Sequence, residues 1–310
     1  MDTLRIGIGD LTHDAVHWWE LAGHDPEDLA GAWAQSHHAA RLAALVGTFW
    51  GSPRGDSAHT ALTWMSGHGL LDGLFVSEPV AGPRPMRGVL RLWNLDLLLV
   101  EETGVPIETT QLVGMTLAEA HDWIVQATTT HASSPKRAIH PIKTDPVSPV
   151  SAEGKPFAEA SHLAQAELIR LYANSTAVLE QFTWTVEGAS PVRVWPHSFE
   201  ASVQVRLPAL SPEESPRFIV LGLAPPGELS ASGYWYVAPW RVGGDEQSPW
   251  AALPFGSWVP RTGEPPIAIL PLTEVTSTQN PAEQHARLAG FLASAFNESV
   301  QQLRRQDPAR

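Results

Sequence analysis

The sequence predicts an α+β protein of two halves, each an antiparallel sheet flanked by helices. Segments with strand-like alternation lie in runs between segments of helical periodicity, in the order helix, strands, helix, linker, helix, strands, helix. Strands gathered in runs favour antiparallel sheets over a doubly wound parallel sheet. A Pro-rich stretch at 131–156 separates the two runs, so we expect halves at 1–130 and 157–310 joined by an extended linker.

The first half opens on a helix and continues as strands. Asp25 is a candidate N-cap, Pro26 suits the first helical position, and the helix is expected to end near Gly47. Thr116 and Glu119 form a capping box that begins a short helix. Between these helices, apolar alternation bounded by Gly and Pro predicts strands at 59–64, 73–80 and 88–102.

The second half repeats this order. An apolar stripe from Ala164 to Phe182 predicts a long helix, and Asn280 caps a final helix with a clean apolar face. Strands are expected between them at 192–207, 217–225, 233–240 and 265–272. In both halves a long helix and a Pro/Gly loop precede a strand that opens on His. An internal duplication is therefore one interpretation, although the apolar residues after His59 and His197 have opposite parity.

Composition and charge exclude several classes of protein. The formal net charge of −13 disfavours nucleic acid and anionic membranes as partners, because such a surface repels phosphate groups. The chain contains no Cys, which rules out disulfides and thiolate metal sites. The N-terminus lacks the features of a signal peptide, and no apolar run approaches the ~20 residues that span a bilayer. We therefore expect a cytoplasmic protein with no membrane partner.

Familiar catalytic motifs are missing from the sequence. It contains no H-E-x-x-H zinc motif, no G-x-S-x-G nucleophile motif and no Walker loop. The "GIGD" at 6–9 lacks the third Gly of a dinucleotide-binding loop, and "GDS" at 55–57 does not follow a strand. No cofactor is expected from these patterns.

A set of short motifs nevertheless resembles one known family. The quoted stretches, in chain order, are "GDSAHTALTW" (55–64), "GKPF" (154–157), "LIRLYANSTAVLE" (168–180), "WPHSFE" (195–200), "LGLAPPGE" (221–228), "YWYVAPW" (234–240), "LP" (253–254) and "AILP" (268–271). They resemble the bacterial domain-of-unknown-function family 5996, whose usual forms are DSHT-x-L, WPHHFD, GxSPGD, PYxYVxPWP and AVLP. The family has no assigned activity, so the resemblance implies relatives and no reaction.

This chain departs from the family pattern at positions that bear on metal binding. Ser198 stands where the family has a second His, and Glu200 and Glu228 stand where it has Asp. Where the family commonly has His-Thr after a Trp, this chain has Val259 and Pro260. If paired His residues held a metal in the family, this chain has lost at least two ligands. We therefore expect no metal here.

His197 is the first candidate for a functional side chain. In a continuous strand it shares the parity of Phe199 and faces the apolar side, whereas Glu200 faces the polar side. Three interpretations remain open: a core His bonded to the backbone, an acid/base or ligand-binding His in a pocket, or a metal ligand. Trp195 precedes it at the expected mouth of the sheet.

Further candidates lie in both halves. His59 follows Asp56 and is a candidate base oriented by a carboxylate, the alternative being an ordinary turn before a strand. Tyr234 and Tyr236 share one strand face and are candidates for an aromatic pocket wall. Glu228, after Pro-Pro-Gly, is a candidate ligand contact or a solvated turn residue.

Two functions follow from these residues. The first is a protein that binds a small neutral or cationic molecule in an aromatic pocket with His and carboxylate groups, and an enzyme if His197 or His59 with Asp56 performs acid/base chemistry. In that pocket Glu200, Glu228, Trp195, Tyr234 and Tyr236 bind the ligand. The second is a non-catalytic binding or interaction protein in which the same residues are structural. The sequence indicates neither the reaction nor the oligomeric state.

Overall fold

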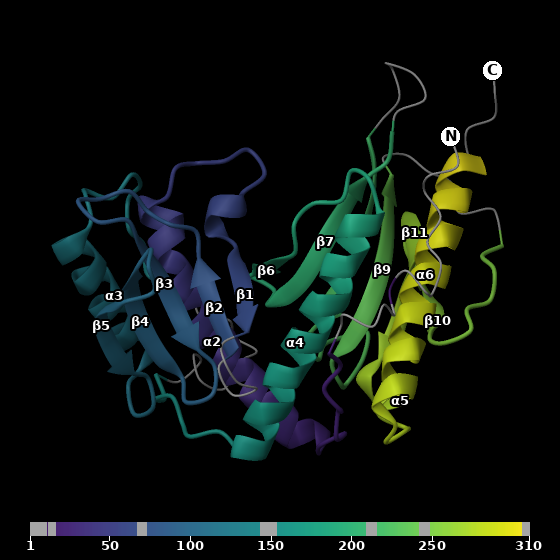
Figure 1. The fold of residues 1–310 in the computed structure, drawn as a ribbon, viewed down its shortest axis with the longest axis horizontal. Helices are drawn as coiled ribbons and strands as arrows, with labels where there is room; N and C mark the ends of the chain where they lie inside the picture. The colour runs from purple at the N-terminus through teal and green to yellow at the C-terminus, as the bar shows by residue number, and fades with distance from the viewer. Residues whose placement is uncertain are drawn as a thin grey trace. The chain divides into compact units, whose positions relative to one another are not determined.

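The computed structural model describes residues 11, 17–66, 73–142, 154–208, 216–241 and 249–305, and it confirms the α+β class. The chain forms two compact units (Figure 1). We call the first the α2 unit; it contains His24–Ala173 and Arg193–Glu200. The second, the α6 unit, contains Met1–Gly23, Asn174–Val192 and Ala201–Arg310.

The unit boundaries differ from the predicted division at 131–156. The first part of helix α4 (His162–Thr185) belongs to the α2 unit, because its Tyr172 packs against Trp33 of α2 and Phe75 of β2. The described part of the predicted linker carries neither helix nor strand apart from His131, the last residue of helix α3. Residues 143–153 of that linker lie outside the described residues. The internal duplication stays a prediction.

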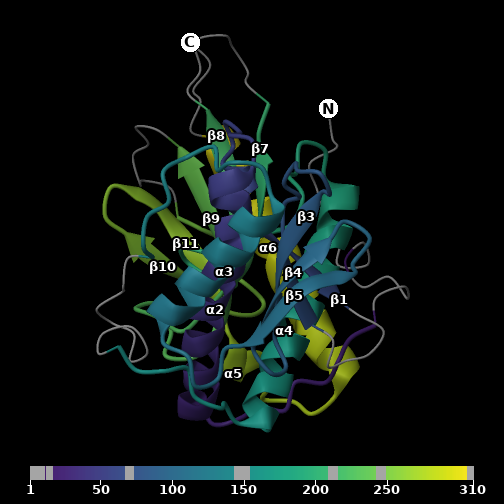
Figure 2. The same ribbon diagram turned by 90° about the vertical axis from the view of Figure 1, so that its left-hand side faces the viewer.

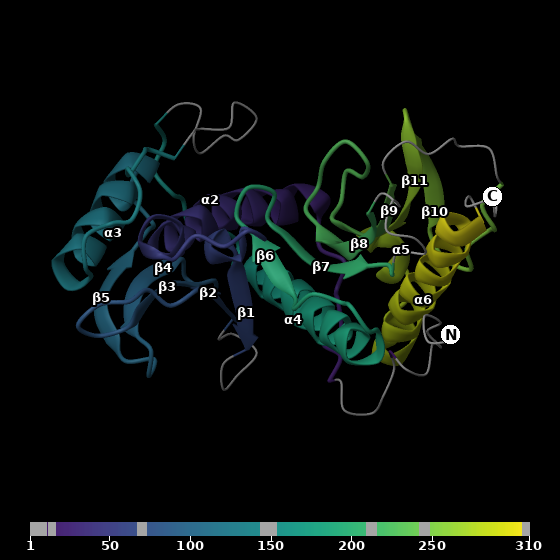
Figure 3. The same cartoon turned by 90° about the horizontal axis from the view of Figure 1, so that it is seen from above.

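The α2 unit is an antiparallel sheet with helices on one face. Its strand order is β6-β1-β2-β3-β4-β5. Helices α2 and α3 lie on one side of strands β2 to β5 (Figures 2 and 3). The bounds are α2 Pro26–Trp50, the 3₁₀ turn η1 Ala58–Thr60, β1 Leu62–Ser66, β2 Gly73–Ser77, β3 Met86–Arg91, β4 Asp96–Glu101, β5 Pro106–Gln111, α3 Leu117–His131 and β6 Arg193–Trp195.

The contact between α2 and this sheet depends on two glycines. A Cβ on Gly88 of β3 would lie 2.3 Å from the carbonyl oxygen of Ala43 in α2. A Cβ on Gly47 of α2 would lie 2.4 Å from the carbonyl oxygen of His59. The helix therefore packs directly on backbone at both positions, and the side chains of Phe75, Leu90 and Leu99 fill the remaining core.

The α6 unit is also antiparallel, with the strand order β10-β11-β9-β8-β7. Helix α6 packs across β9, β8 and β11, and Phe182 of α4 meets Phe296 of α6 with ring centroids 4.9 Å apart. The bounds are β7 Glu200–Arg206, β8 Arg217–Ala224, β9 Tyr234–Arg241, β10 Ser257–Arg261, β11 Glu264–Pro271, α5 Leu272–Val275 and α6 Pro281–Arg305. In the part of the chain that is described, helices are too short or too polar to span a membrane.

Several predicted elements are confirmed, and three predicted strands are corrected. The strand predicted at 59–64 begins only at Leu62, because His59 lies in the turn η1. The capping box of Thr116 and Glu119 forms as expected at the start of α3. The predicted strand 88–102 is two strands, β3 and β4, because the chain reverses in a turn at 92–95 where Leu95 takes a left-handed φ of 54°. The predicted strand 192–207 is interrupted by a turn after β6. Strands β5 and β10 were not predicted.

Candidate functional site

His59 and Asp56 occupy a polar cluster at the start of β1. His59 is buried in the turn η1, where Arg137 donates to its Nε2 at 2.6 Å and the backbone N–H of Arg54 lies 3.3 Å from its Nδ1. A guanidinium can only donate and a neutral imidazole has one acceptor nitrogen, so the shorter contact fixes Nε2 as the acceptor. Burial lowers the pKa of His59, and the Arg137 guanidinium lowers it further. The neutral ring therefore accepts a hydrogen bond from Arg137.

Asp56 makes its contacts elsewhere. Its carboxylate accepts from the backbone N–H of Ala58 at 3.1 Å and forms ion pairs with Arg54 at 3.3 Å and Arg193 at 3.2 Å. The Ala58 hydrogen bond holds the pKa of Asp56 below its ordinary value, and the two arginines add to this effect. The catalytic role of His59 with Asp56 stays a prediction, and Nε2 of the ring already accepts from Arg137.

His197 lies in the turn between β6 and β7 and is exposed, so the expectation that it faces the apolar side of a strand is wrong. Pro196 interrupts the ladder, and the N–H of Phe199 bonds to the carbonyl of Trp195 at 2.6 Å, which closes the turn. Phe199 takes a left-handed φ of 58° within this turn. The ring of His197 lies 6.0 Å from that of Trp195. Glu200 is half-buried at the start of β7.

A different histidine performs the core role that the sequence left open for His197. His37 of α2 stacks on the buried ring of Phe199 at 5.3 Å, and its Nε2 lies 2.9 Å from the carbonyl oxygen of Pro196. Tyr172 donates to the carbonyl of Phe199 at 2.6 Å. These contacts hold the strained Phe199 backbone and make the surrounding aromatic rings a packed core.

The remaining predicted residues belong to the α6 unit. Trp235 is fully buried and donates from its indole to Ser175 of α4 at 2.9 Å. Tyr234 and Tyr236 lie on the opposite face of β9, with ring centroids 6.3 Å apart. Glu228 is exposed in the turn between β8 and β9. None of the eight predicted site residues lines either of the two cavities described next.

A polar cavity of about 300 Å³ lies in the α2 unit where the β3–β4 turn meets the start of α4. We call it the Trp93 pocket; it is lined by Trp93, Asn94, Leu95, Gln111, Val113, Glu159, Ala160, His162 and Gln165. The turn contributes Trp93 and Asn94 because β3 and β4 pair in register up to Arg91 and Asp96 and leave 92–95 as the connection. Helix α4 contributes His162 and Gln165 from its first turn.

Two side-chain oxygens in this pocket are buried without a hydrogen-bond donor among the described residues. Gln165 is 2% exposed, and its Nε2 donates to the carbonyl of Leu92 at 2.5 Å and contacts Ser36 Oγ at 3.1 Å. A carbonyl can only accept, so the amide orientation is fixed and Oε1 is the atom without a donor. Asn94 behaves in the same way: Nδ2 donates to Asp96 Oδ2 at 2.7 Å and leaves Oδ1 unmatched.

An aromatic pair and one carboxylate form the outer part of the pocket. The rings of Trp93 and His162 stack with centroids 5.1 Å apart and planes 13° from parallel. Glu159 Oε1 lies 3.7 Å from His162 Nε2, and both side chains are largely exposed. Among the residues that the structure describes, the pocket lining contains neither Lys nor Arg. Its polar groups are therefore chiefly acceptors, with a negative charge at the mouth.

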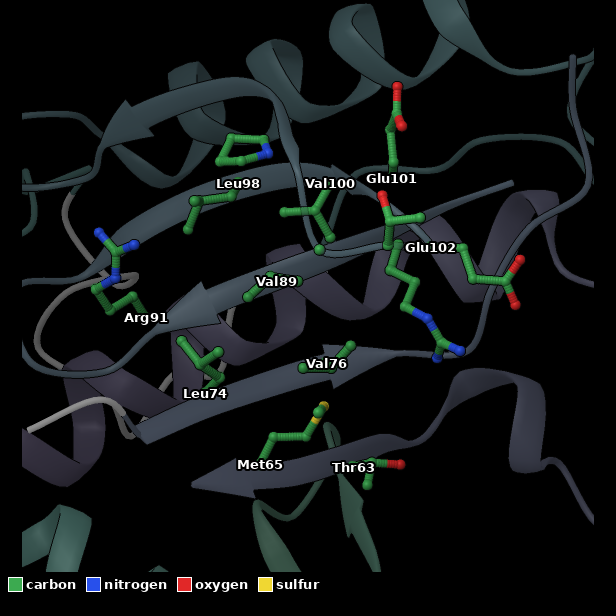
Figure 4. Close-up of a pocket in the computed structure, with 14 residues that line it drawn as sticks. Thr63, Met65, Leu74, Val76, Val89, Arg91, Leu98, Val100, Glu101 and Glu102 are labelled. Carbon is green, nitrogen blue, oxygen red and sulfur yellow. The ribbon is translucent and has the colours of Figure 1, made fainter. Parts of the chain in front are cut away.

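A second, apolar cavity of about 400 Å³ lies on the face of the same sheet that is opposite α2 (Figure 4). We call it the sheet groove. Its floor consists of alternate residues of β2, β3 and β4, namely Leu74, Val76, Val89, Leu98 and Val100. Thr63, Met65, Arg87, Arg91, Glu101, Glu102, Thr103, Gly104 and Pro106 line its sides.

One carboxylate links the two cavities. Asp96 Oδ2 accepts from Asn94 of the Trp93 pocket at 2.7 Å and from Arg91 of the sheet groove at 3.0 Å.

Within the described part of the chain, His, Asp and Glu side chains do not gather in any group of three that could hold a metal ion. The expectation of no metal stays a prediction.

Comparison with protein-family models, with curated proteins and with solved structures found no match to this chain. The resemblance to family 5996 therefore rests on the quoted motifs alone and stays a prediction.

The residues that line both cavities were not predicted from the sequence. Trp93 and Asn94 fell inside a predicted continuous strand, and Gln165 was not among the residues singled out on the predicted helix. One signal was present: Asn is typical of turns because it tolerates left-handed backbone and bonds to nearby backbone groups. The Trp-Asn pair within "RLWNLD" marked the reversal. The unmatched oxygen of Gln165 left no signal, since it depends on the position of Leu92 in the fold.

Proposed function

We propose that this protein binds a small molecule that presents N–H donors and a positive charge, and that the Trp93 pocket is its site. The observation that carries the proposal is Gln165, a residue of the cavity lining whose buried Oε1 has no donor among the described residues. A buried acceptor left unsatisfied costs about 1–3 kcal/mol, and a bound donor would recover this free energy.

The other lining groups support the same ligand chemistry. Asn94 Oδ1 is a second unmatched acceptor, and the carboxylate of Glu159 favours a cation over an anion. The face of an aromatic ring attracts cations, and Trp is the strongest of the aromatic side chains in this respect. An ammonium or guanidinium group on a small planar body therefore matches the pocket. This ligand class agrees with the neutral or cationic molecule expected from the sequence, although the residues that bind it are different.

The proposal is tested by calorimetric titration with three probes that share one ring: benzylamine, benzamide and benzoate. The amine is expected to bind most tightly, the neutral amide less tightly, and the carboxylate not at all, because two acceptors and a carboxylate face the ligand. Equal binding of benzylamine and benzoate would overturn the assignment, and so would a failure of all three probes to bind.

Two substitutions locate the site, one at the half-buried Trp93 and one at the exposed Glu159. Trp93→Leu is expected to weaken benzylamine binding at least about tenfold, which corresponds to about 1.4 kcal/mol. Its matched control is Trp184→Leu, since Trp184 is 79% exposed and lies in the part of α4 that belongs to the α6 unit. Glu159→Gln should narrow the preference for benzylamine over benzamide. Its control is Glu228→Gln, which should leave that preference unchanged. A narrower preference in this control would instead support Glu228, the ligand contact predicted from the sequence.

A further inference from the structure

The sheet groove is a second cavity whose chemistry differs from that of the Trp93 pocket. Its floor is entirely aliphatic, and Met65 at its edge is 51% exposed. In Figure 4 the side chains of Leu74, Val76 and Val89 point from neighbouring strands into one shared space. A cavity of about 400 Å³ lies within the range of small-molecule sites.

The charged groups of the groove are balanced. Arg91 pairs with Asp96 at 3.0 Å, and Glu101 pairs with Arg84 at 2.8 Å. The other two charged lining groups, Arg87 and Glu102, have no ion-pair partner within the described residues. Arg87 donates to the carbonyl oxygen of Ser77 at 3.1 Å.

These two groups lie at one end of the groove. Arg87 is paired in register with Val100, near the end of β4, and Glu102 follows that strand. One group can donate hydrogen bonds and the other can accept them. A head group with a net charge would be repelled by one of the two, whereas a hydroxyl or amide can accept from the guanidinium and donate to the carboxylate.

We propose that the sheet groove binds a neutral amphiphile, a molecule with an unbranched aliphatic chain and an uncharged hydroxyl or amide head. The chain lies on the floor of Leu74, Val76, Val89, Leu98 and Val100. The head lies between Arg87 and Glu102. This site is independent of the ligand proposed for the Trp93 pocket.

Calorimetric titration with 1-butanol, 1-hexanol and 1-octanol tests the chain. Each added methylene should tighten binding about fourfold, the ratio that corresponds to burial of one CH₂, until the cavity is full. Octanoate and octylamine at the same chain length test the head, and both should bind more weakly than octanol. Affinity that does not depend on chain length, or a charged head that binds as tightly as the alcohol, overturns the proposal.

Substitutions on the rim sharpen the test of the head group. Arg87→Gln leaves Glu102 alone and should shift the preference toward octylamine, while Glu102→Gln should shift it toward octanoate. Arg206→Gln, an exposed position on β7 in the other unit, is the matched control and should change neither. An unchanged order of probes in both rim variants would contradict the placement of the head.

Two further variants test the floor. Val89→Phe fills the centre of the groove and should abolish octanol binding. Because an enlarged core residue can destabilise the fold, Met65→Glu provides a second test at an exposed position on the edge and should weaken octanol binding at least tenfold. Octanol affinity that persists in a folded variant of either kind overturns the proposal.

Discussion

Two buried glutamines, one in each unit, carry the same side chain with opposite results. Gln284 of α6 is fully buried, and its Oε1 accepts from the indole N–H of Trp18 at 3.2 Å and the backbone N–H of Leu21 at 2.9 Å. Its Nε2 donates to the carbonyls of Leu21 at 2.9 Å and Thr278 at 2.8 Å. Gln165 of α4 is as deeply buried, but its Oε1 has no donor among the described residues.

The difference separates scaffold from site. A buried polar group whose donors and acceptors are all matched stabilises the fold and holds its neighbours, as Gln284 holds the segment of Trp18 and Leu21 against α6. A buried acceptor without a donor destabilises the protein, and under the proposed function the ligand of the Trp93 pocket supplies the donor that Gln165 lacks. Burial alone does not make this distinction; the hydrogen-bond partners do.

The largest loss of stability is expected for Gln284→Met. The change keeps the volume of the side chain but removes partners from the N–H groups of Trp18 and Leu21 and from the carbonyls of Leu21 and Thr278. Since each unsatisfied buried group costs about 1–3 kcal/mol and four groups lose a partner, we expect the free energy of unfolding to fall by at least about 4 kcal/mol. Urea denaturation measures it, with Gln126→Met, an exposed position on α3, as the control. A fall in the free energy of unfolding of less than about 1 kcal/mol would show that the matched hydrogen bonds of Gln284 do not distinguish it from Gln165.

Tyr172→Phe is expected to have the next largest effect. The hydroxyl donates to the carbonyl of Phe199 at 2.6 Å and receives a longer contact of 3.4 Å from the indole N–H of Trp33. Burial raises the pKa of this hydroxyl well above its ordinary value, so it remains a donor at neutral pH. Its removal should lower the free energy of unfolding by about 1–3 kcal/mol. Benzylamine affinity at the Trp93 pocket should not change, and a change there would show that Tyr172 is not simply scaffold.

The sequence predicted the class of fold and most helices because these follow from local patterns. The N-cap at Asp25 and the capping box at Thr116 are local chemistry, and both appear in the structure. The apolar stripe of α6 likewise predicted a helix that packs on a sheet. Wherever periodicity and capping agree, tertiary contacts only reinforce the local preference.

The candidate site could not be predicted in the same way. His197 was assigned a direction by strand parity, and a single turn at Pro196 cancels that argument. Trp93 and Asn94 were absorbed into an apolar run because Leu95, rather than a glycine, takes the left-handed conformation of the turn. The importance of Gln165 depends on which backbone carbonyl lies beside its amide, and no pattern within α4 contains that information.

Acidification should destabilise the protein through two buried histidines. Burial lowers the pKa of His59, and the neighbouring Arg137 lowers it further. Burial also lowers the pKa of His285, although the hydrogen bond between its ring and the Leu11 carbonyl acts in the opposite direction. The unfolded chain then binds protons more readily than the folded chain below the ordinary value of 6.5. Stability is complete above that pH and falls as the pH drops through it toward the lowered values.

The measurement is urea denaturation at several pH values for the wild type and for His59→Gln. Between about pH 7 and about pH 5, the free energy of unfolding should fall less in this variant than in the wild type. It should fall less still in the double variant with His285→Gln. Exposed His197→Gln is the control and should retain the full decline. Stability that rises on acidification would mean that the histidines gain partners as cations, contrary to the Arg137 contact.

Gln165→Met is expected to change stability least and ligand binding most. The substitution deprives the Leu92 carbonyl and the Ser36 hydroxyl of their donor, but it also removes an unmatched buried oxygen whose burial costs about 1–3 kcal/mol. The contributions oppose each other, so the free energy of unfolding should fall by about 2 kcal/mol or less, in contrast to Gln284→Met. Benzylamine binding should nevertheless disappear, because the acceptor in the pocket wall is gone. If Gln165→Met instead destabilises the protein as much as Gln284→Met does and leaves benzylamine affinity intact, then Oε1 is matched within the native protein and both glutamines are scaffold.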